Sequence, residues 1–414
     1  MKTQILTFLF TAIFLLTTFT RCTLNDSGDG PESTDNFLVS HEKVKDYLPA
    51  FIESILQQVV GDNPEYASLI SKVEHGVSVY KIHYNTFFRG QKTVASGLVC
   101  VPTSLGTFPV LSYQNGTNTL NSKAPSVDPD FELYVLLEFM ASTGFIITIP
   151  DYLGFGASSD MFHPYLDKES TVQTVIDMQY ATKELVKNYL EVDMSDDLYI
   201  AGYSQGGWAT MQLQKSIEEE YSDIFDLKAS ACGAGPYDLN YINDYITGLD
   251  QYPMPYFVGY IFNSYYNLGY IATPIEQVFM EPYDSKILTL YDGTMAGEAI
   301  NNELNTSIPL LFTSNYINNH NTDEIYNTIN QSLEANSIGA WKTTTPTMLM
   351  HGTEDTFVPP LVTSMIHQNF MLEGVGTDKI ILLPLQGETH QSGIIPAGIA
   401  SMAWFLELKD AEAM

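Results

Sequence analysis

The chain has 414 residues, 45% of them hydrophobic and 12% aromatic, which is enough apolar material for a large buried core. Its formal net charge of −31, from 49 acidic and 18 basic residues, argues against nucleic acid as a partner, because the phosphates would be repelled. The sequence has no His-Glu-x-x-His motif, no cysteine–histidine cluster and no phosphate-binding glycine loop followed by lysine, so we expect neither a metal site nor a cofactor.

Residues 1–22 have the pattern of an export signal. Lys2 precedes an apolar run at residues 5–19, which is short for a membrane span and typical of a signal-peptide core. Cys22 follows closely, as in a bacterial lipoprotein signal, where that cysteine is lipidated and attaches the mature chain to the membrane. Arg21 departs from the small residue usual at that position, and an ordinary secretory signal is the alternative.

A folded domain is expected after this signal. Residues 23–39 are polar and acidic without hydrophobic periodicity, which predicts a flexible linker, and residues 40–414 form the expected catalytic domain. The domain should begin with a helical segment around residues 40–72. The signal places the chain in the bacterial cell envelope, held by a lipid, or outside the cell. The sequence predicts no particular oligomeric state.

Apolar runs rich in β-branched residues alternate with helical segments along most of this domain. The runs at 77–86 and 93–103 predict an antiparallel pair of strands. Buried strands are expected at 108–114, 145–152, 198–203, 227–235, 346–352 and 379–385, with helices at 130–143, at 170–190, where Ser170 is the expected cap, and after residue 204. This alternation predicts an α/β fold with a mostly parallel sheet of about eight strands and helices on both faces.

Residues 236–342 interrupt the alternation. They are rich in tyrosine and asparagine and contain helix-like pieces such as PYFVGYIFNSYYNLGY and TDEIYNTINQSL. We expect a mostly helical insertion at the carboxyl ends of the strands. Its tyrosines are interpreted as packing residues.

The stretch GYSQGG (202–207) lies between a strand-like run and a helical segment. The pattern G-x-S-x-G is short enough to arise by chance. A strand before it and a helix after it, however, are the context of a nucleophile elbow. Glycines flank the serine in such a turn because strand and helix leave no room for side chains. The start of the helix would also favour developing negative charge. We therefore expect Ser204 to be a nucleophile.

A serine nucleophile needs a general base and a group that orients the base. His390 directly follows the run at 379–385, and Asp355 follows the run at 346–352, so both are expected at the catalytic edge of the sheet. Glu354 is the alternative to Asp355. His351 precedes the acid and is expected to order that turn.

The negative charge that develops on the substrate oxygen needs hydrogen-bond donors. The expected donors are the backbone N–H groups of Gln205, which follows the nucleophile, and of Thr117 in the loop NGTNT. A plain glycine turn is the alternative for that loop. The segment DYLGFGASSDMFHPYL (151–166) ends another strand near the same edge. It either shapes the pocket or is a simple turn, and we favour the turn for its individual side chains.

These motifs together resemble those of the α/β-hydrolases, and more narrowly of the secretory lipase family that includes yeast lipase A-type enzymes. The resemblance spans about residues 75–408 and is carried by VLSYQNGT (110–117), IPDYLGFGASSDMFHPYL (149–166), AGYSQGG (201–207), GAGPYDL (233–239), HGTEDTFVP (351–359) and GETH (387–390). It implies a Ser204, Asp355 and His390 triad, ester hydrolysis, and an insertion that caps the acyl site. The loop at 115–116 departs from the more usual His-Gly form, having Asn-Gly.

The expected activity is hydrolysis of a small-molecule or lipid ester by an exported serine esterase or lipase. Two alternatives keep the same triad: an esterase that removes feruloyl or acetyl groups from polysaccharide, and a serine peptidase of the prolyl oligopeptidase type. The remaining alternative is a surface binding lipoprotein without catalysis.

Overall fold

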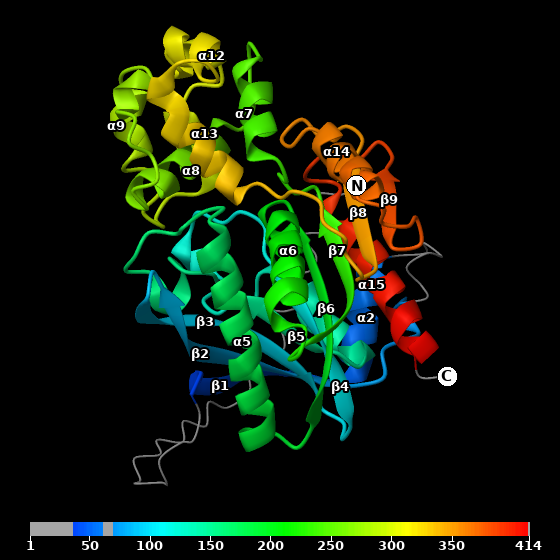
Figure 1. Ribbon diagram of the computed structural model, residues 1–414. Helices are drawn as coiled ribbons and strands as arrows, with labels where there is room; N and C mark the ends of the chain where they lie inside the picture. The colour runs from blue at the N-terminus through cyan, green and yellow to red at the C-terminus, as the bar shows by residue number, and fades with distance from the viewer. Residues whose placement is uncertain (1–35, 61–68, 413–414) are drawn as a thin grey trace.

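The computed structural model describes residues 36–60 and 69–412, and within them a single nine-stranded sheet forms the centre (Figure 1). The strand order is β1-β2-β3-β5-β4-β6-β7-β8-β9. The antiparallel pairs are β1–β2, β2–β3 and β3–β5, and the other neighbouring pairs are parallel. The strands are β1 (Leu38–Tyr47), β2 (Val77–Phe88), β3 (Gln91–Pro102), β4 (Thr107–Gln114), β5 (Ile146–Pro150), β6 (Asp193–Tyr203), β7 (Asp226–Gly233), β8 (Thr347–Gly352) and β9 (Ile380–Leu385).

Strands β2 to β9 overlap the eight runs that the sequence predicts, but β1 was not expected. The linker prediction for 23–39 is wrong where Leu38 begins β1, and the helix expected around 40–72 is strand up to Tyr47. Of the ten residues of β1, an edge strand that pairs only with β2, only Leu38 is buried, so the sequence shows no alternation of apolar and polar residues. Residues 1–35, with Cys22 and the signal, lie outside the described residues.

Helices cover both faces of the sheet, as the sequence predicts (Figure 1). One face carries α5 (Lys168–Tyr189), α6 (Gln205–Ser216) and α14 (Leu361–Leu372), and the other carries α2 (Pro49–Val60), α4 (Glu132–Met140) and α15 (Ile394–Glu412). Successive strand residues point to opposite faces, so Tyr199 packs in the cluster with Phe405 of α15, while Ile200 packs in the cluster with Val175 of α5. The central strands are therefore buried on both sides.

The first turn of α5 differs from the expected one. The helix begins at Lys168, and its cap is Asp167, not Ser170. The Asp167 carboxylate accepts a hydrogen bond from the Ser170 backbone N–H at 3.0 Å and another from the Ser170 hydroxyl at 2.6 Å. Aspartate is as good a cap as serine, so composition alone did not separate the two residues.

Residues 239–336 form a helical unit above the carboxyl ends of the central strands, called the cap below (Figure 1). Its own core is strongly aromatic: Phe279 packs against Phe312 with ring centroids 4.9 Å apart, and Phe262 packs edge-on against Phe279 at 5.0 Å. Across the described parts of the chain, we find no helix with the length and apolar character needed to cross a bilayer. The cap helices are α7 (Leu239–Thr247), α8 (Pro255–Asn267), α9 (Tyr283–Ile287), α10 (Gly297–Glu303), α11 (Ile308–Leu311), α12 (Ser314–Asn319) and α13 (Asn327–Asn336).

The unexpected strand β1 is attached to α4 through a buried carboxyl group. Glu138 is fully buried and lies 3.3 Å from the Lys45 ammonium, and it accepts a hydrogen bond of 2.8 Å from the Tyr47 hydroxyl. Lys45 also pairs with exposed Asp130 at 3.0 Å. Burial raises the pKa of Glu138 to about 7, although Lys45 and Tyr47 both favour the carboxylate.

We predict a specific pH dependence of stability from this carboxyl. Because its pKa rises from 4.5 in the unfolded chain to about 7 in the fold, the contribution of Glu138 to the free energy of unfolding is largest below pH 4.5 and is lost as the pH rises through 7. Relative to Glu138→Gln, the wild type should lose about 2 kcal/mol between pH 5 and pH 8. Urea unfolding of both proteins at the two pH values measures this. An unchanged difference between them would contradict the prediction.

Candidate active site

Ser204 occupies the turn that joins β6 to α6. Its backbone has φ +61° and ψ −122°, a conformation that residues with a side chain rarely adopt. The turn packs α6 tightly against β4 and β7: a side chain on Gly206 would collide with the Gln114 carbonyl oxygen, and one on Gly207 with the Gly233 carbonyl oxygen. The glycines are therefore required by close approach, and the Ser204 hydroxyl stands at the start of α6, as in a nucleophile elbow.

Ser204, His390 and Asp355 form one continuous chain of hydrogen bonds. The Ser204 Oγ lies 2.8 Å from His390 Nε2, and His390 Nδ1 lies 2.6 Å from Asp355 Oδ2. Asp355 follows β8 and His390 follows β9, so two neighbouring parallel strands bring them to the edge where β6 ends. An ionised carboxylate only accepts hydrogen bonds, so Nδ1 carries the proton and Nε2 faces the serine hydroxyl as an acceptor.

The Asp355 carboxylate is buried and hydrogen-bonded at both oxygens. Oδ1 accepts from the backbone N–H groups of Phe357 and Val358, at 2.8 Å and 3.0 Å. Oδ2 accepts from His390 and, at 3.1 Å, from His351 Nε2. Burial by itself would raise the pKa of Asp355, but the hydrogen bonds from His351 and His390 outweigh it and hold the pKa well below its ordinary value. The carboxylate is therefore ionised at neutral pH.

Two other residues of this turn, His351 and Glu354, have different surroundings and therefore different roles. His351 is buried, and its Nε2 also lies 2.9 Å from the Val358 carbonyl oxygen, while its Nδ1 lies 2.6 Å from the Thr363 hydroxyl. His351 thus connects the acid to its own turn. Glu354, the alternative acid, is exposed, and the hydrogen bond from His390 goes to Asp355.

The loop after β4 passes directly beside Ser204. A side-chain carbon on Gly116 would lie 3.4 Å from the Tyr203 carbonyl oxygen and 4.0 Å from the Ser204 Cβ, so the backbone here approaches the nucleophile closely. Gln205 is the first residue of α6, where backbone N–H groups have no partner within the helix. The two expected oxyanion donors therefore belong to segments next to the serine: Gln205 follows it in the chain, and Thr117 follows Gly116, whose backbone lies close to it.

The site also contains two side chains, His163 and Tyr165, that have no assigned role in the sequence analysis. The Tyr165 hydroxyl lies 2.7 Å from the Thr117 hydroxyl, and the Gln205 side-chain amide donates to His163 Nε2 at 3.0 Å. His163 and Tyr165 belong to the segment 151–166, whose individual side chains are interpreted from the sequence as parts of a simple turn. Their one signal in the sequence was position, in a loop that follows a strand at the catalytic edge.

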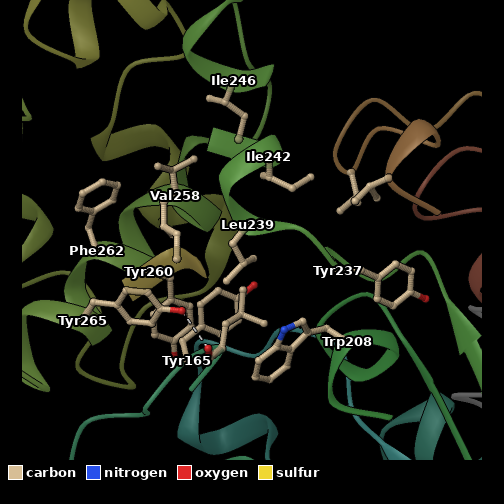
Figure 2. Packing of buried hydrophobic residues seen from close by; sticks show 14 of the residues in the cluster. Tyr165, Trp208, Tyr237, Leu239, Ile242, Ile246, Val258, Tyr260, Phe262 and Tyr265 are labelled. Atoms are coloured by element: carbon tan, nitrogen blue, oxygen red, sulfur yellow. Dashed lines mark hydrogen bonds between the residues drawn. The ribbon is translucent and has the colours of Figure 1, made fainter. Parts of the chain in front are cut away.

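A pocket with an empty volume of about 580 Å³ opens beside Ser204, under the cap. Its walls come mainly from α7, through side chains such as Leu239 and Ile242, and from α8, through Val258 and Phe262. Figure 2 shows these side chains above Tyr165 and Trp208. None of the described residues that line this pocket is charged.

Comparisons with known proteins agree with this architecture. Residues 131–246, which include Ser204, match the prolyl oligopeptidase family. A presumed hydrolase from Legionella pneumophila is similar in structure over 91% of this chain and 100% of its own, with a TM-score of 0.79 and 26% sequence identity. No curated protein matches the chain.

Two further solved structures share the fold. The rice cell wall degrading esterase LipA from Xanthomonas oryzae covers 91% of this chain, with 98% of its own length, a TM-score of 0.74 and 22% identity. Candida antarctica lipase A, in its closed state, covers 89% of this chain, with 81% of its own length, a TM-score of 0.64 and 13% identity. The chain has the α/β-hydrolase fold and is a hydrolase of the α/β-hydrolase type.

Proposed function

We propose that this chain is a serine carboxylic-ester hydrolase that acts through an acyl-enzyme. The observation that carries the proposal is the unbroken chain of hydrogen bonds from Asp355 through His390 to the Ser204 hydroxyl, at the wall of an apolar pocket. This is the arrangement that activates a serine for attack on a carbonyl carbon.

In the proposed reaction, the Ser204 oxygen attacks the ester carbonyl while His390 Nε2 takes the hydroxyl proton. Asp355 stabilises the resulting imidazolium, and the backbone N–H groups of Gln205 and Thr117 bind the oxyanion. His390 then returns the proton to the leaving alcohol. A water molecule, deprotonated by His390, attacks the acyl-enzyme and releases the carboxylic acid and the free serine. No step requires a cofactor.

The pocket favours an uncharged, apolar acyl group. Its lining is almost entirely aliphatic and aromatic, and the polar side chains there, such as Asn243 and Tyr252, are neutral. Burying each additional methylene in such a pocket contributes about 0.8 kcal/mol, so the acyl chain can supply much of the binding energy. A neutral ester of a small-molecule alcohol or a lipid fits this lining.

Two alternative substrates keep the same chemistry. The match of residues 131–246 to the prolyl oligopeptidase family favours a serine peptidase as the second candidate. An exopeptidase would need carboxylates to bind the substrate amine, and the described residues lining the pocket supply none. The structural similarity to a cell wall degrading esterase keeps a polysaccharide esterase as a further variant of the proposal.

We further propose that the enzyme is exported and that Cys22 becomes its lipidated first residue. This rests on the sequence of residues 1–22, with Lys2 before the apolar run and the cysteine after it.

Ester hydrolysis should depend on Ser204. With p-nitrophenyl esters from acetate to palmitate, kcat/KM should rise by up to about fourfold per added methylene until the pocket is filled. Ser204→Ala should lower kcat on the order of 10⁴-fold or more, because the nucleophile is lost. Spectrophotometric release of p-nitrophenol measures both effects.

The same panel should contain a feruloyl ester and an aminoacyl p-nitroanilide. Hydrolysis of the anilide alone would replace the esterase with a peptidase. Equal rates for the wild type and Ser204→Ala would overturn the triad.

Asp355 and its neighbour Glu354 form a matched pair for testing the acid. Asp355→Asn should lower kcat by about 10⁴-fold, because the amide no longer holds the His390 tautomer that accepts the serine proton. Glu354→Gln should change kcat by less than about twofold, since the side chain is exposed. Steady-state kinetics of both variants, with circular dichroism as a check on folding, makes the comparison. A large loss for Glu354→Gln and none for Asp355→Asn would reverse the assignment.

The proposed export makes a prediction about the mature N-terminus. Mass spectrometry of the protein purified from its own membranes should show residue 22 as the first residue, carrying a diacylglycerol and a fatty acyl group. An unmodified start elsewhere would contradict lipidation, and a retained Met1 would contradict export.

A further inference from the structure

Two side-chain hydrogen bonds connect one loop to the two residues that are expected to bind the oxyanion. The loop between β5 and α5 carries His163 and Tyr165, two residues apart. His163 Nε2 accepts from the Gln205 side-chain amide at 3.0 Å, and the Tyr165 hydroxyl lies 2.7 Å from the Thr117 hydroxyl. The two partners, Gln205 and Thr117, are the residues whose backbone N–H groups should bind the oxyanion.

We propose that His163 and Tyr165 are positioning residues that hold the two halves of the oxyanion hole in register from one loop. The inference rests on the proposed function, because it assigns a role within that same reaction. Tyr165 also lines the pocket beside Ser204, whereas His163 is not among the lining residues. In this proposal each residue acts through the side chain of a residue whose main chain binds the oxyanion.

His163 is a rigid anchor for Gln205. It is buried, and its Nδ1–H donates to the Leu153 carbonyl oxygen at 2.7 Å, which leaves Nε2 as the acceptor for the Gln205 amide. The ring packs against Phe155 at 4.9 Å and Tyr260 at 5.6 Å between centroids. Burial lowers the pKa of His163 to about 4, so this acceptor persists at the neutral pH where the esterase would work.

Tyr165 is held as firmly from the cap side. Its ring stacks on Tyr260 of α8, with centroids 4.4 Å apart and an interplanar angle of 8°. The carbonyl oxygen of the next residue, Leu166, accepts a hydrogen bond of 3.0 Å from the hydroxyl of Tyr265, which also belongs to α8. The loop is therefore clamped between the cap and the nucleophile turn.

Such anchoring matters because oxyanion stabilisation depends steeply on geometry. A donor is effective when it lies about 2.7–3.1 Å from the oxyanion, and a displacement of about 1 Å can cost on the order of 100-fold in rate. A side-chain substitution does not remove the backbone N–H group of a residue. The position of that N–H group depends on the contacts that hold the rest of the residue. Loss of either side-chain tie should lower kcat by about 10-fold while substrate binding stays nearly unchanged.

The Tyr165–Thr117 tie can be cut from either end without a change in side-chain volume. Tyr165→Phe and Thr117→Val should each lower kcat about 10-fold with KM within about threefold, and the double variant should be no slower than the slower single variant. The inhibition constant of a trifluoromethyl ketone should rise by the same factor as kcat/KM falls, because its hemiketal oxygen occupies the oxyanion site.

The His163–Gln205 hydrogen bond can be tested by variants that remove it and by one that restores its acceptor. His163→Asn keeps a donor near the Nδ1 position but removes the Nε2 acceptor, and it should behave like Gln205→Met, which removes the amide. His163→Gln can place an acceptor near the Nε2 position and should recover part of kcat. Because Gln205→Met leaves His163 untouched, it tests the tie even where a His163 variant does not fold.

Tyr326→Phe is the matched control, since this cap tyrosine is buried and is not among the residues that line the pocket. The change removes the hydrogen bond of 3.1 Å to the Gln277 carbonyl oxygen and the one of 2.9 Å from the Asn315 amide. It should leave kcat and the inhibition constant unchanged.

The inference is overturned if Tyr165→Phe and Gln205→Met stay folded and both remain within about twofold of the wild type in kcat and inhibitor binding. The inference is also overturned if these variants lower the melting temperature but change neither kcat nor inhibitor binding. Failure of the proposed function would look different, since the wild type itself would not hydrolyse esters.

Discussion

The site depends on the lack of space between α6 and the ends of its neighbouring strands β4 and β7. Because α6 packs against the carbonyl oxygens of Gln114 and Gly233, only glycine fits at positions 206 and 207, and Ser204 is forced to φ +61° at the apex of the turn. That conformation is costly for a residue with a side chain and persists only where the surrounding fold imposes it. The parallel sheet is what imposes it, and the same sheet brings His390 and Asp355 within reach of the serine.

Around this turn, the protein combines a polar network with an apolar pocket. On one side, Asp355 keeps its charge in a buried position because four hydrogen bonds satisfy its oxygens. On the other side, the cap supplies aliphatic and aromatic walls and also holds the loop of His163 and Tyr165. The cap therefore has two tasks in this account: it forms the acyl pocket, and it fixes the elements that place the oxyanion donors.

The positions of strands β2 to β9, and the meeting of Ser204, Asp355 and His390 at one edge, could be anticipated because they depend on local patterns: apolar runs, glycines at the elbow, and polar residues directly after strands. The edge strand β1 could not, since its residues are mostly exposed and its place is set by Glu138 of a distant helix. The same holds for His163. Its bond to Gln205 joins residues 42 positions apart, and no local pattern predicts a contact between two loop side chains. The sequence therefore locates the expected catalytic residues, whereas the residues that position them are recognised only from tertiary contacts.

The most direct test of the account is covalent labelling of the nucleophile, which requires no knowledge of the substrate. A fluorophosphonate should form one serine–phosphorus bond with loss of fluoride, and peptide mass spectrometry should place the label on Ser204. The label should be lost in His390→Ala, because the hydroxyl then has no base. A folded wild type that stays unlabelled, or a label on another serine, would contradict the central claim.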